Sequence, residues 1–274
     1  MLFLAPTDPL RSLPGISLAP DAVSILPHAA DYREHLLALI RQAKRRIHLC
    51  ALYLQQDEGG QQILDALYAA AAANPRLDIK LFVDAHRAGR GLIGHGKQEG
   101  NAAWYRQQAQ AHPQTRLAIY GVPVQTRELF GVMHLKGYVV DDTVLYSGAS
   151  LNNVYLHVGE RYRFDRYHLI HSPALADSLS GYMLDYLAAA PAVLRLDQPI
   201  TVDKGSQNRA TRLFRKQLAR SQYQVVDSAP CNSGLSIHPV VGVGRNNRFN
   251  KLLERLLHSA QQRISICTPY FNLP

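Results

Sequence analysis

The apolar residues of this chain alternate between a helical and a strand period, and this alternation constrains the fold more than any other feature. Leu36, Leu39 and Ile40 recur at helical spacing, whereas residues 47–54 and 79–83 form short, nearly continuous apolar runs. The first pattern is typical of an amphipathic helix and the second of a buried strand. Strands that alternate with helices predict a layered α/β domain with a mostly parallel or mixed sheet.

The same reading along the chain predicts the order of the elements. Asp31, followed by Glu34, resembles a capping box that opens the first helix. The expected helices run from Asp31, from Gly59-Gly60 to Asn74-Pro75, around Trp104 and from Pro173. The expected strands cover residues 47–54, 79–83, 117–122 and 167–170, with a hairpin of 137–140 and 144–146 around Asp141-Asp142-Thr143.

The opening helix–strand pattern recurs near the end of the chain. Residues 32–54 align without a gap on 249–271, at a constant offset of 217 that places Cys50 on Cys267. A repeat at one register indicates internal duplication. We therefore expect a first domain over 1–193, a connector over 194–234 with a helix near 212–220, and the truncated start of a second domain over 235–274.

Composition narrows the classes of protein. The chain has 274 residues, of which 47% are hydrophobic and 19% charged, as is ordinary for a globular protein. Its apolar runs are shorter than the roughly 20 residues of a membrane span, and its start lacks the basic region of a secretory signal. These features predict a cytoplasmic protein.

The positive charge of the chain indicates an anionic partner. The formal net charge is +9, which suits a phosphate-bearing substrate, an anionic membrane or nucleic acid. A basic, glycine-rich stretch over 86–97 contains Arg87, Arg90 and Lys97, which we expect to contact phosphates because glycine lets backbone N–H groups approach closely.

Cysteine and histidine spacing gives no sign of a metal or cofactor. The three cysteines lack CxxC spacing, and Cys50 and Cys267 lie in apolar runs, so we interpret them as buried free thiols. No HExxH or Cys/His ligand cluster is present in the sequence. We therefore expect chemistry that needs neither.

The strongest local signal is His134-Leu135-Lys136, with Asp141 five residues after the lysine and Ser150 and Asn152 beyond it. On a strand, residues two apart share a face, so the imidazole and the ammonium should project together. A nucleophile or general acid beside a fixed positive charge suits attack on phosphorus, whose non-bridging oxygens carry negative charge. Asp141 falls at the hairpin turn, where its side chain can hold backbone groups.

These residues resemble the motif of the phospholipase D superfamily, which is HxK, four residues, Asp, and then a Gly-Ser-x-Asn-like segment. Ala149 stands where many members have glycine. Longer segments look like the bacterial phospholipase D-type phosphatidylserine synthases over nearly the whole chain, among them CALYLQQD, VDAHRAGRG and LYSGASLNNVYLH. The resemblance implies a phospholipase D-like fold, with CDP-diacylglycerol and L-serine as substrates and phosphatidylserine and CMP as products.

The resemblance also implies residue roles. One histidine forms a phosphohistidine, and a second protonates the departing CMP and later deprotonates serine. Lys136, Ser150 and Asn152 would bind the phosphate, while Asp165 would steady the other ring nitrogen of the histidine. With no membrane span, the protein would bind peripherally to the inner, anionic face of the membrane.

Several alternatives stay open at this stage. Cardiolipin synthases, phospholipases D and nucleic-acid phosphodiesterases share the motif, and a basic module that binds membrane or RNA without turnover would also explain the charge. If the repeat continues at the offset of 217, the counterpart of His134 falls near position 351. We therefore expect residues 1–274 to be inactive alone and to need the missing C-terminal half as a partner, unless two copies combine their histidines.

Overall fold

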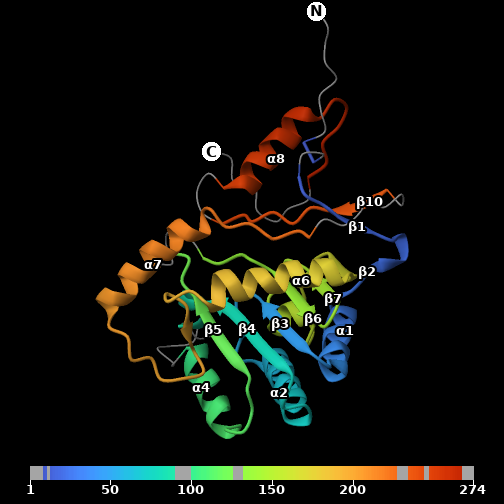
Figure 1. Cartoon of the computed structure of the whole chain (residues 1–274). Coiled ribbons are helices and arrows are strands. Elements are labelled where there is room, and N and C mark those ends of the chain that lie inside the picture. Colours follow the sequence, from blue (N-terminus) through green and yellow to red (C-terminus); the bar gives the residue numbers. More distant parts are fainter. Residues whose placement is uncertain are drawn as a thin grey trace, which may run out of the picture.

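The computed structural model describes residues 9–10, 13–89, 100–125, 132–226, 234–243 and 247–266. Its centre is an eight-stranded mixed sheet in the order β2-β8-β7-β6-β3-β4-β5-β9 (Figure 1). The strands are β2 (Val23–Leu26), β3 (Arg46–Cys50), β4 (Asp78–Asp84), β5 (Ala118–Val122), β6 (Gly137–Val140), β7 (Thr143–Tyr146), β8 (Tyr167–His171) and β9 (Leu194–Arg195). β3, β4 and β5 are parallel neighbours, and the other pairs are antiparallel.

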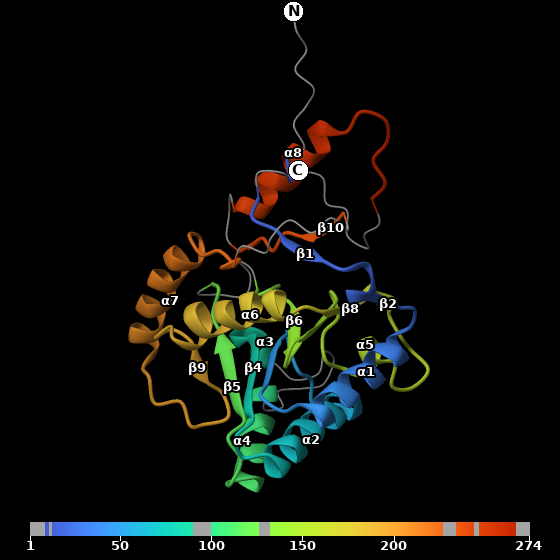
Figure 2. The ribbon, with the colours of Figure 1, turned by 45° about the vertical axis from the view of Figure 1, so that its right-hand side comes forward.

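Helices cover both faces of this sheet. One face carries α1 (Ala29–Gln42), α2 (Glu58–Ala73), α4 (Asn101–Ala111) and the short α5 (Asn153–Leu156). The other face carries α6 (Pro173–Tyr182), which continues into a π-helical turn, η3 (Met183–Ala188), and α7 (Lys204–Leu218). Figures 1 and 2 both show α7 beside α6. The predicted layered α/β fold with a mixed sheet is confirmed.

Side-chain alternation along the strands divides the core into two layers. On β4, Leu81 and Val83 pack with α1 and α2, whereas Phe82 between them packs with α6. On β6, Val140 belongs to the first layer and Val139 to the second. Strands buried on both faces require apolar residues in succession, which is why these segments read as continuous apolar runs.

Most predicted elements are confirmed, with shifted ends. α2 ends just before Asn74, and Pro173 occupies the first turn of α6. The capping box at Asp31 is wrong, because α1 begins at Ala29 with His28 at its N-cap and no side-chain cap. The first apolar run is only partly strand, because β3 ends at Cys50 and the chain then bends to form an isolated bridge between Leu54 and Leu151.

Two features lie above the main sheet in Figures 1 and 2. β1 (Ile16–Leu18) pairs antiparallel with β10 (Leu235–Ile237), which the sequence did not predict. α8 (Arg248–Ser259) follows, and residues 261–266 after it are not in a strand. The rest of the strand expected there, including Cys267, lies outside the described residues, as does Cys231. Cys50 is a buried free thiol, as expected.

No helix among the described residues is both long enough and apolar enough to cross a bilayer. Two shorter elements complete the description. They are the 3-10 turn η1 (Pro20–Ala22) and the four-residue α3 (Ala85–Ala88), which follows β4 directly.

The β6–β7 turn is fastened to the start of β3 by Asp141. Its carboxylate accepts hydrogen bonds from the backbone N–H groups of Lys44 at 2.9 Å, Arg45 at 2.8 Å and Arg46 at 3.1 Å. Asp141 has φ +50°, a left-handed conformation that Asp and Asn tolerate better than most residues. Burial raises the pKa of this carboxyl, but the three N–H donors lower it by more, so the net shift is downward.

We predict that Asp141→Ala lowers the free energy of unfolding by about 2 kcal/mol, because it removes an acceptor for three backbone N–H groups. Asp142→Ala is the control and should cost less than about 1 kcal/mol, since Asp142 makes partly exposed ion pairs with Arg45 and Arg46. Denaturant unfolding measures both. Equal losses would contradict the fastening role.

The same contact has a pH dependence. A carboxyl whose pKa is lower in the folded than in the unfolded state stabilises the fold above its unfolded pKa and loses that contribution as the pH falls through its folded pKa. The difference in stability between Asp141 and Asp141→Asn should therefore shrink in acid.

Candidate active site

The His134–Lys136 segment is the extended approach to β6, which begins at Gly137. The sequence predicted that these two residues lie within a strand. In the structure they lie directly before one. The thiol of Cys50 on β3 contacts the carbonyl oxygen of Leu135 at 3.6 Å. Gly137 has φ +136°, a conformation that favours glycine, and its position next to Lys136 fixes how the segment enters the sheet.

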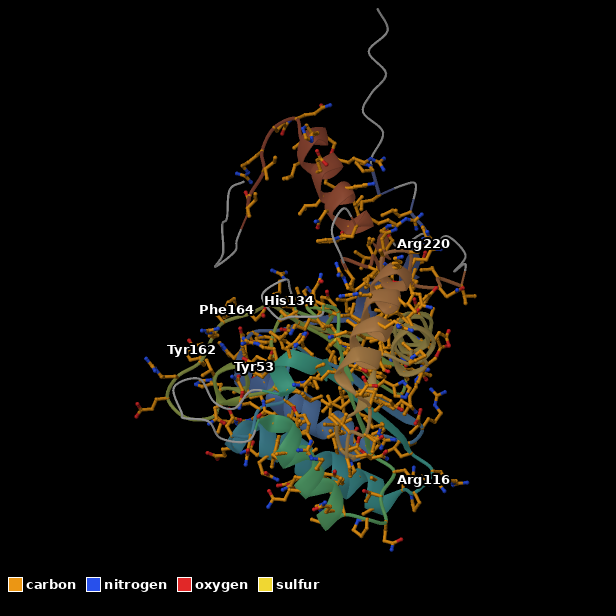
Figure 3. The ribbon with its side chains drawn as sticks, turned by 90° about the vertical axis from the view of Figure 1, so that its left-hand side faces the viewer. Tyr53, Arg116, His134, Tyr162, Phe164 and Arg220 are labelled. Atoms are coloured by element: carbon orange, nitrogen blue, oxygen red, sulfur yellow. The ribbon has the colours of Figure 1, made fainter. Side chains whose placement is uncertain are left out.

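His134 and Lys136 line one cavity of about 1340 Å³. The wall of this cavity also includes residues of α7, the segment 240–243, Phe249 of α8, Tyr146 and Tyr223. Figure 3 shows His134 and Tyr53 toward one edge of the molecule, and Arg116 far from them. The predicted pairing of imidazole and ammonium on one surface is therefore seen in the structure.

The Lys136 ammonium is buried, with the residue 9% exposed. Nζ donates a hydrogen bond to Ser150 Oγ at 3.2 Å, and no carboxylate among the described residues lies within ion-pair distance of it. Burial lowers the pKa of Lys136 to about 8, against the opposing influence of Cys50 and Asp165. A buried ammonium with spare N–H groups is a binding site for an anion.

The imidazole of His134 is exposed to the cavity and forms no hydrogen bond with a described residue. Partial desolvation of the ring lowers the pKa of His134, and the positive charges of Lys136 and Arg87 lower it further, while Asp84 opposes them. The imidazole is therefore mainly neutral at pH 7, which is the form that can act as a nucleophile or a base.

Asn152 is present beside this group but is already engaged. Its Oδ1 caps α5 by accepting the Tyr155 N–H at 3.0 Å, and its Nδ2 donates to Tyr53 Oη at 3.4 Å. The guanidinium of Arg87 lies 5.7 Å from the centre of the Tyr53 ring. Arg87, Tyr53 and Asn152 thus form a chain of contacts beside the His134 segment. Arg90 and Lys97 lie outside the described residues, so their role stays a prediction.

Asp165 is near enough to Lys136 to influence its pKa, and it forms no hydrogen bond with His134 among the described contacts. Its charge raises the pKa of Lys136 and is not among the influences on His134. A Cβ atom on Gly148 would come within 2.8 Å of Asp165 Oδ2, so glycine leaves the space that the carboxylate occupies. The charge of Asp165 thus acts on Lys136, and its expected role toward the imidazole of His134 stays a prediction.

The sequence groups Asp141 with the catalytic motif and also predicts that its side chain holds backbone groups at the hairpin turn, and the structure shows the backbone contacts. Its carboxylate is used by three backbone N–H groups at the far end of β6 from Lys136. It positions the strand that follows the catalytic pair and does not join the pair itself.

Asp84 is a site residue that sequence reasoning missed. It is fully buried at the end of β4, and its Oδ1 accepts the N–H groups of His86 and Arg87, both at 2.9 Å. Its Oδ2 accepts the Met133 N–H at 2.7 Å. One carboxylate thus ties α3 to the segment that carries His134. The signal was an aspartate directly after an apolar strand and before Ala-His-Arg, at the position of an N-cap.

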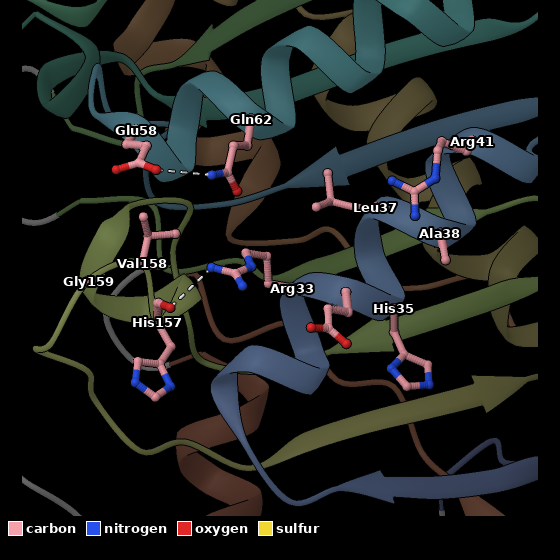
Figure 4. A pocket seen from close by; sticks show the side chains of 11 residues that line it. Arg33, His35, Leu37, Ala38, Arg41, Glu58, Gln62, His157, Val158 and Gly159 are labelled. Atoms are coloured by element: carbon pink, nitrogen blue, oxygen red, sulfur yellow. Dashed lines mark hydrogen bonds between the residues drawn. The ribbon is translucent and has the colours of Figure 1, made fainter.

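A second hollow of about 890 Å³ lies between α1, α2 and the turn after α5 (Figure 4). Its polar groups bond to one another: Arg33 Nη1 donates to the His157 carbonyl at 3.1 Å, and Gln62 donates to Glu58 at 3.4 Å. None of the motif residues lines it. We therefore assign the chemistry to the cavity of His134 and Lys136.

Comparison with known families agrees with this geometry. The family model described as "Cardiolipin synthase, PLD-like domain" matches residues 36–183, which is more than half of the chain and includes the whole motif. An eight-stranded mixed sheet that presents His134 and Lys136 to one cavity is consistent with that match. The chain belongs to the phospholipase D-like family.

Two similar proteins match nearly the whole of this chain. The chain is 45% identical to the CDP-diacylglycerol–serine O-phosphatidyltransferase of Escherichia coli K12, over 97% of this chain and 58% of that protein. The crystal structure of phosphatidylserine synthase from Haemophilus influenzae Rd KW20 matches with a TM-score of 0.91 and 43% identity, over 97% of this chain and 59% of that one. The chain thus spans somewhat less than three fifths of the length of these relatives.

We predict that Ser150→Ala and Asp165→Asn each lower the pKa of Lys136 below about 8, because each removes a group that favours the charged ammonium. Nitrogen-15 NMR of the lysine side chains across a pH titration measures this shift. Asp185→Asn is the control, since Asp185 does not act on Lys136. A Lys136 pKa unchanged in both site variants would contradict the assigned contacts.

Proposed function

We propose that this chain supplies the nucleophilic half of a phosphatidyl-transfer site, which makes phosphatidylserine and CMP from CDP-diacylglycerol and L-serine. The observation that carries the proposal is a neutral imidazole and a buried ammonium on the wall of one cavity, where no described carboxylate forms an ion pair with the ammonium. The names of the two relatives that match 97% of the chain support the choice of substrates.

The first half-reaction follows from these two groups. A ring nitrogen of His134 attacks the phosphatidyl phosphorus, so that a P–N bond forms while the P–O bond to CMP breaks. Lys136 donates hydrogen bonds to the non-bridging oxygens, where negative charge sits, and stabilises the transition state electrostatically. The lowered pKa of His134 keeps its nucleophilic lone pair available.

The second half-reaction needs a proton carrier other than His134. The serine hydroxyl must lose a proton as it attacks the phosphohistidine and releases the imidazole, and a proton donor would also ease the earlier departure of CMP. Among the described residues that line the cavity, His134 is the one histidine. We therefore propose that a second histidine completes the site from a second phospholipase D-like module.

α8 supports the proposal of a duplicated module. The repeat offset of 217 places Tyr32, Leu36 and Ile40 of α1 on Phe249, Leu253 and Leu257 of α8. Those three α1 residues are fully buried against the sheet, whereas their α8 counterparts are 44%, 45% and 40% exposed. The helices also end alike, since Ala43 and Ala260 are both C-caps with extended ψ angles of 137° and 129°. By this equivalence, the apolar face of α8 is where a second sheet packs.

We place the site at an anionic membrane surface. The lipid substrate resides in a bilayer, and the chain carries a net charge of +9. Basic residues near an anionic surface contribute about 1 kcal/mol each to reversible binding. Binding to anionic vesicles that weakens with salt, together with CMP release, would distinguish a working enzyme from a purely adhesive module.

We predict that His134→Asn in the full-length protein abolishes CMP release from CDP-diacylglycerol while the thermal midpoint stays within a few degrees. Lys136→Ala should slow turnover by about 10²-fold or more, through loss of charge stabilisation. Asp165→Asn should be milder than both, because it acts through Lys136. Near-normal turnover by a folded His134→Asn variant would refute the assignment.

The same assay, run with serine, glycerol and water as acceptors, tests the product. Serine should be preferred; preference for glycerol or water would favour a cardiolipin synthase-like enzyme or a phospholipase D. Residues 1–274 assayed alone should not turn over. Sustained activity that rises with the square of the chain concentration would show that two copies of His134 suffice. That result would contradict the proposal of a second module.

A further inference from the structure

α7 presents positive charge to the cavity of His134 and Lys136. Arg212, Arg215 and Lys216 line that cavity, and they are spaced three and four residues apart, so they share one side of the helix. All three are exposed, and none forms an ion pair with a described carboxylate. From the sequence alone, this helix is expected only as part of a connector.

The opposite side of α7 is fixed to the domain. Thr211, Phe214 and Leu218 are each 2% exposed, and Phe214 and Leu218 pack in the core layer of α6. At its N-terminus, Asp203 caps the helix through the N–H groups of Gly205 and Ser206, and Gln207 donates to the Ala192 carbonyl at 2.8 Å. The three cations are therefore carried by a rigid element.

The described residues of the cavity wall carry charge of one sign only. With Lys136, the described lining residues include four side chains of the Lys/Arg type and no Asp or Glu. The rest of the wall is mainly apolar, with Val124, Val132, Leu135, Val240, Val243 and Phe249. A cationic cluster beside an apolar surface fits a ligand with two or more phosphate charges and an apolar part.

We infer that α7 is the subsite for the nucleotide-side phosphate of a lipid-linked nucleoside diphosphate. The identity of the lipid in this inference rests on the proposed function. The binding of a diphosphate rests on the cationic cluster alone. Lys136 and His134 act on the phosphorus that is attacked, and Arg212, Arg215 and Lys216 bind the neighbouring phosphate. As the P–O bond between the two phosphates breaks, that neighbouring phosphate gains negative charge, which the three cations stabilise.

The test is direct binding of soluble probes by calorimetry. CDP and inorganic pyrophosphate are titrated into the full chain and into the triple variant R212Q/R215Q/K216Q. The control is K204Q/R209Q/R220Q, which removes the same charge from α7 and the turn directly after it, at residues that do not line the cavity. Circular dichroism establishes that both variants are folded.

We expect the cavity variant to bind CDP and pyrophosphate at least about tenfold more weakly, since charge-assisted contacts to phosphate are lost. The control should stay within about twofold, and the salt dependence should flatten in the cavity variant alone. In the full-length protein, the cavity variant should raise the KM for CDP-diacylglycerol and also slow CMP release.

Equal weakening in both variants, or none in the cavity variant, would overturn the inference, because net charge or another site would then account for binding. Those outcomes leave the proposed function intact if His134-dependent CMP release persists. Conversely, binding lost in the cavity variant alone supports the phosphate subsite even if no lipid transfer is found, in which case only the proposed reaction fails.

Discussion

The structure depends on one costly interaction, a buried ammonium that has no carboxylate partner in the part of the chain that the structure describes. Lys136 contributes a single hydrogen bond, to Ser150, although an ammonium has three N–H groups to donate. A desolvated charge of this kind destabilises the folded protein unless an anion completes it. The same desolvation lowers the pKa of Lys136 to about 8. A phosphate group bound in the cavity would accept the remaining N–H groups of Lys136, so this residue favours phosphate binding although its burial costs stability.

The surrounding scaffold holds this charge in place. Asp141 fastens the turn at the far end of β6, Asp84 anchors the segment before His134, and Asp165 lies close enough to act on Lys136 without forming a pair. Asp141 and Asp84 bind backbone N–H groups, and Asp165 acts on Lys136 only through its electrostatic potential. None of the three forms an ion pair with the ammonium. That separation leaves the cavity wall cationic, which is the electrostatic condition for phosphoryl chemistry.

The sequence predicted much of this because local patterns carry the information. Apolar periodicity located the sheet and its helices, and the spacing of His134, Lys136, Ser150 and Asn152 identified residues that the fold brings together or near one another. Other features were not accessible to pattern alone. Which backbone groups Asp141 holds depends on how the β6–β7 turn meets the start of β3, and the contribution of α7 depends on how a connector packs across a sheet face. The pairing of β1 with β10 joins segments more than 200 residues apart, which no local signal encodes.

The central claim is that His134 becomes covalently linked to the phosphatidyl group while Lys136 holds its phosphate. The most direct measurement incubates the full-length protein with CDP-diacylglycerol in the absence of serine, quenches it at alkaline pH where phosphohistidine survives, and maps the modified peptide by mass spectrometry. The account predicts a phosphatidyl adduct on the peptide that carries His134, with CMP released in equal amount. An adduct on a different residue, or CMP release without any adduct, would contradict it.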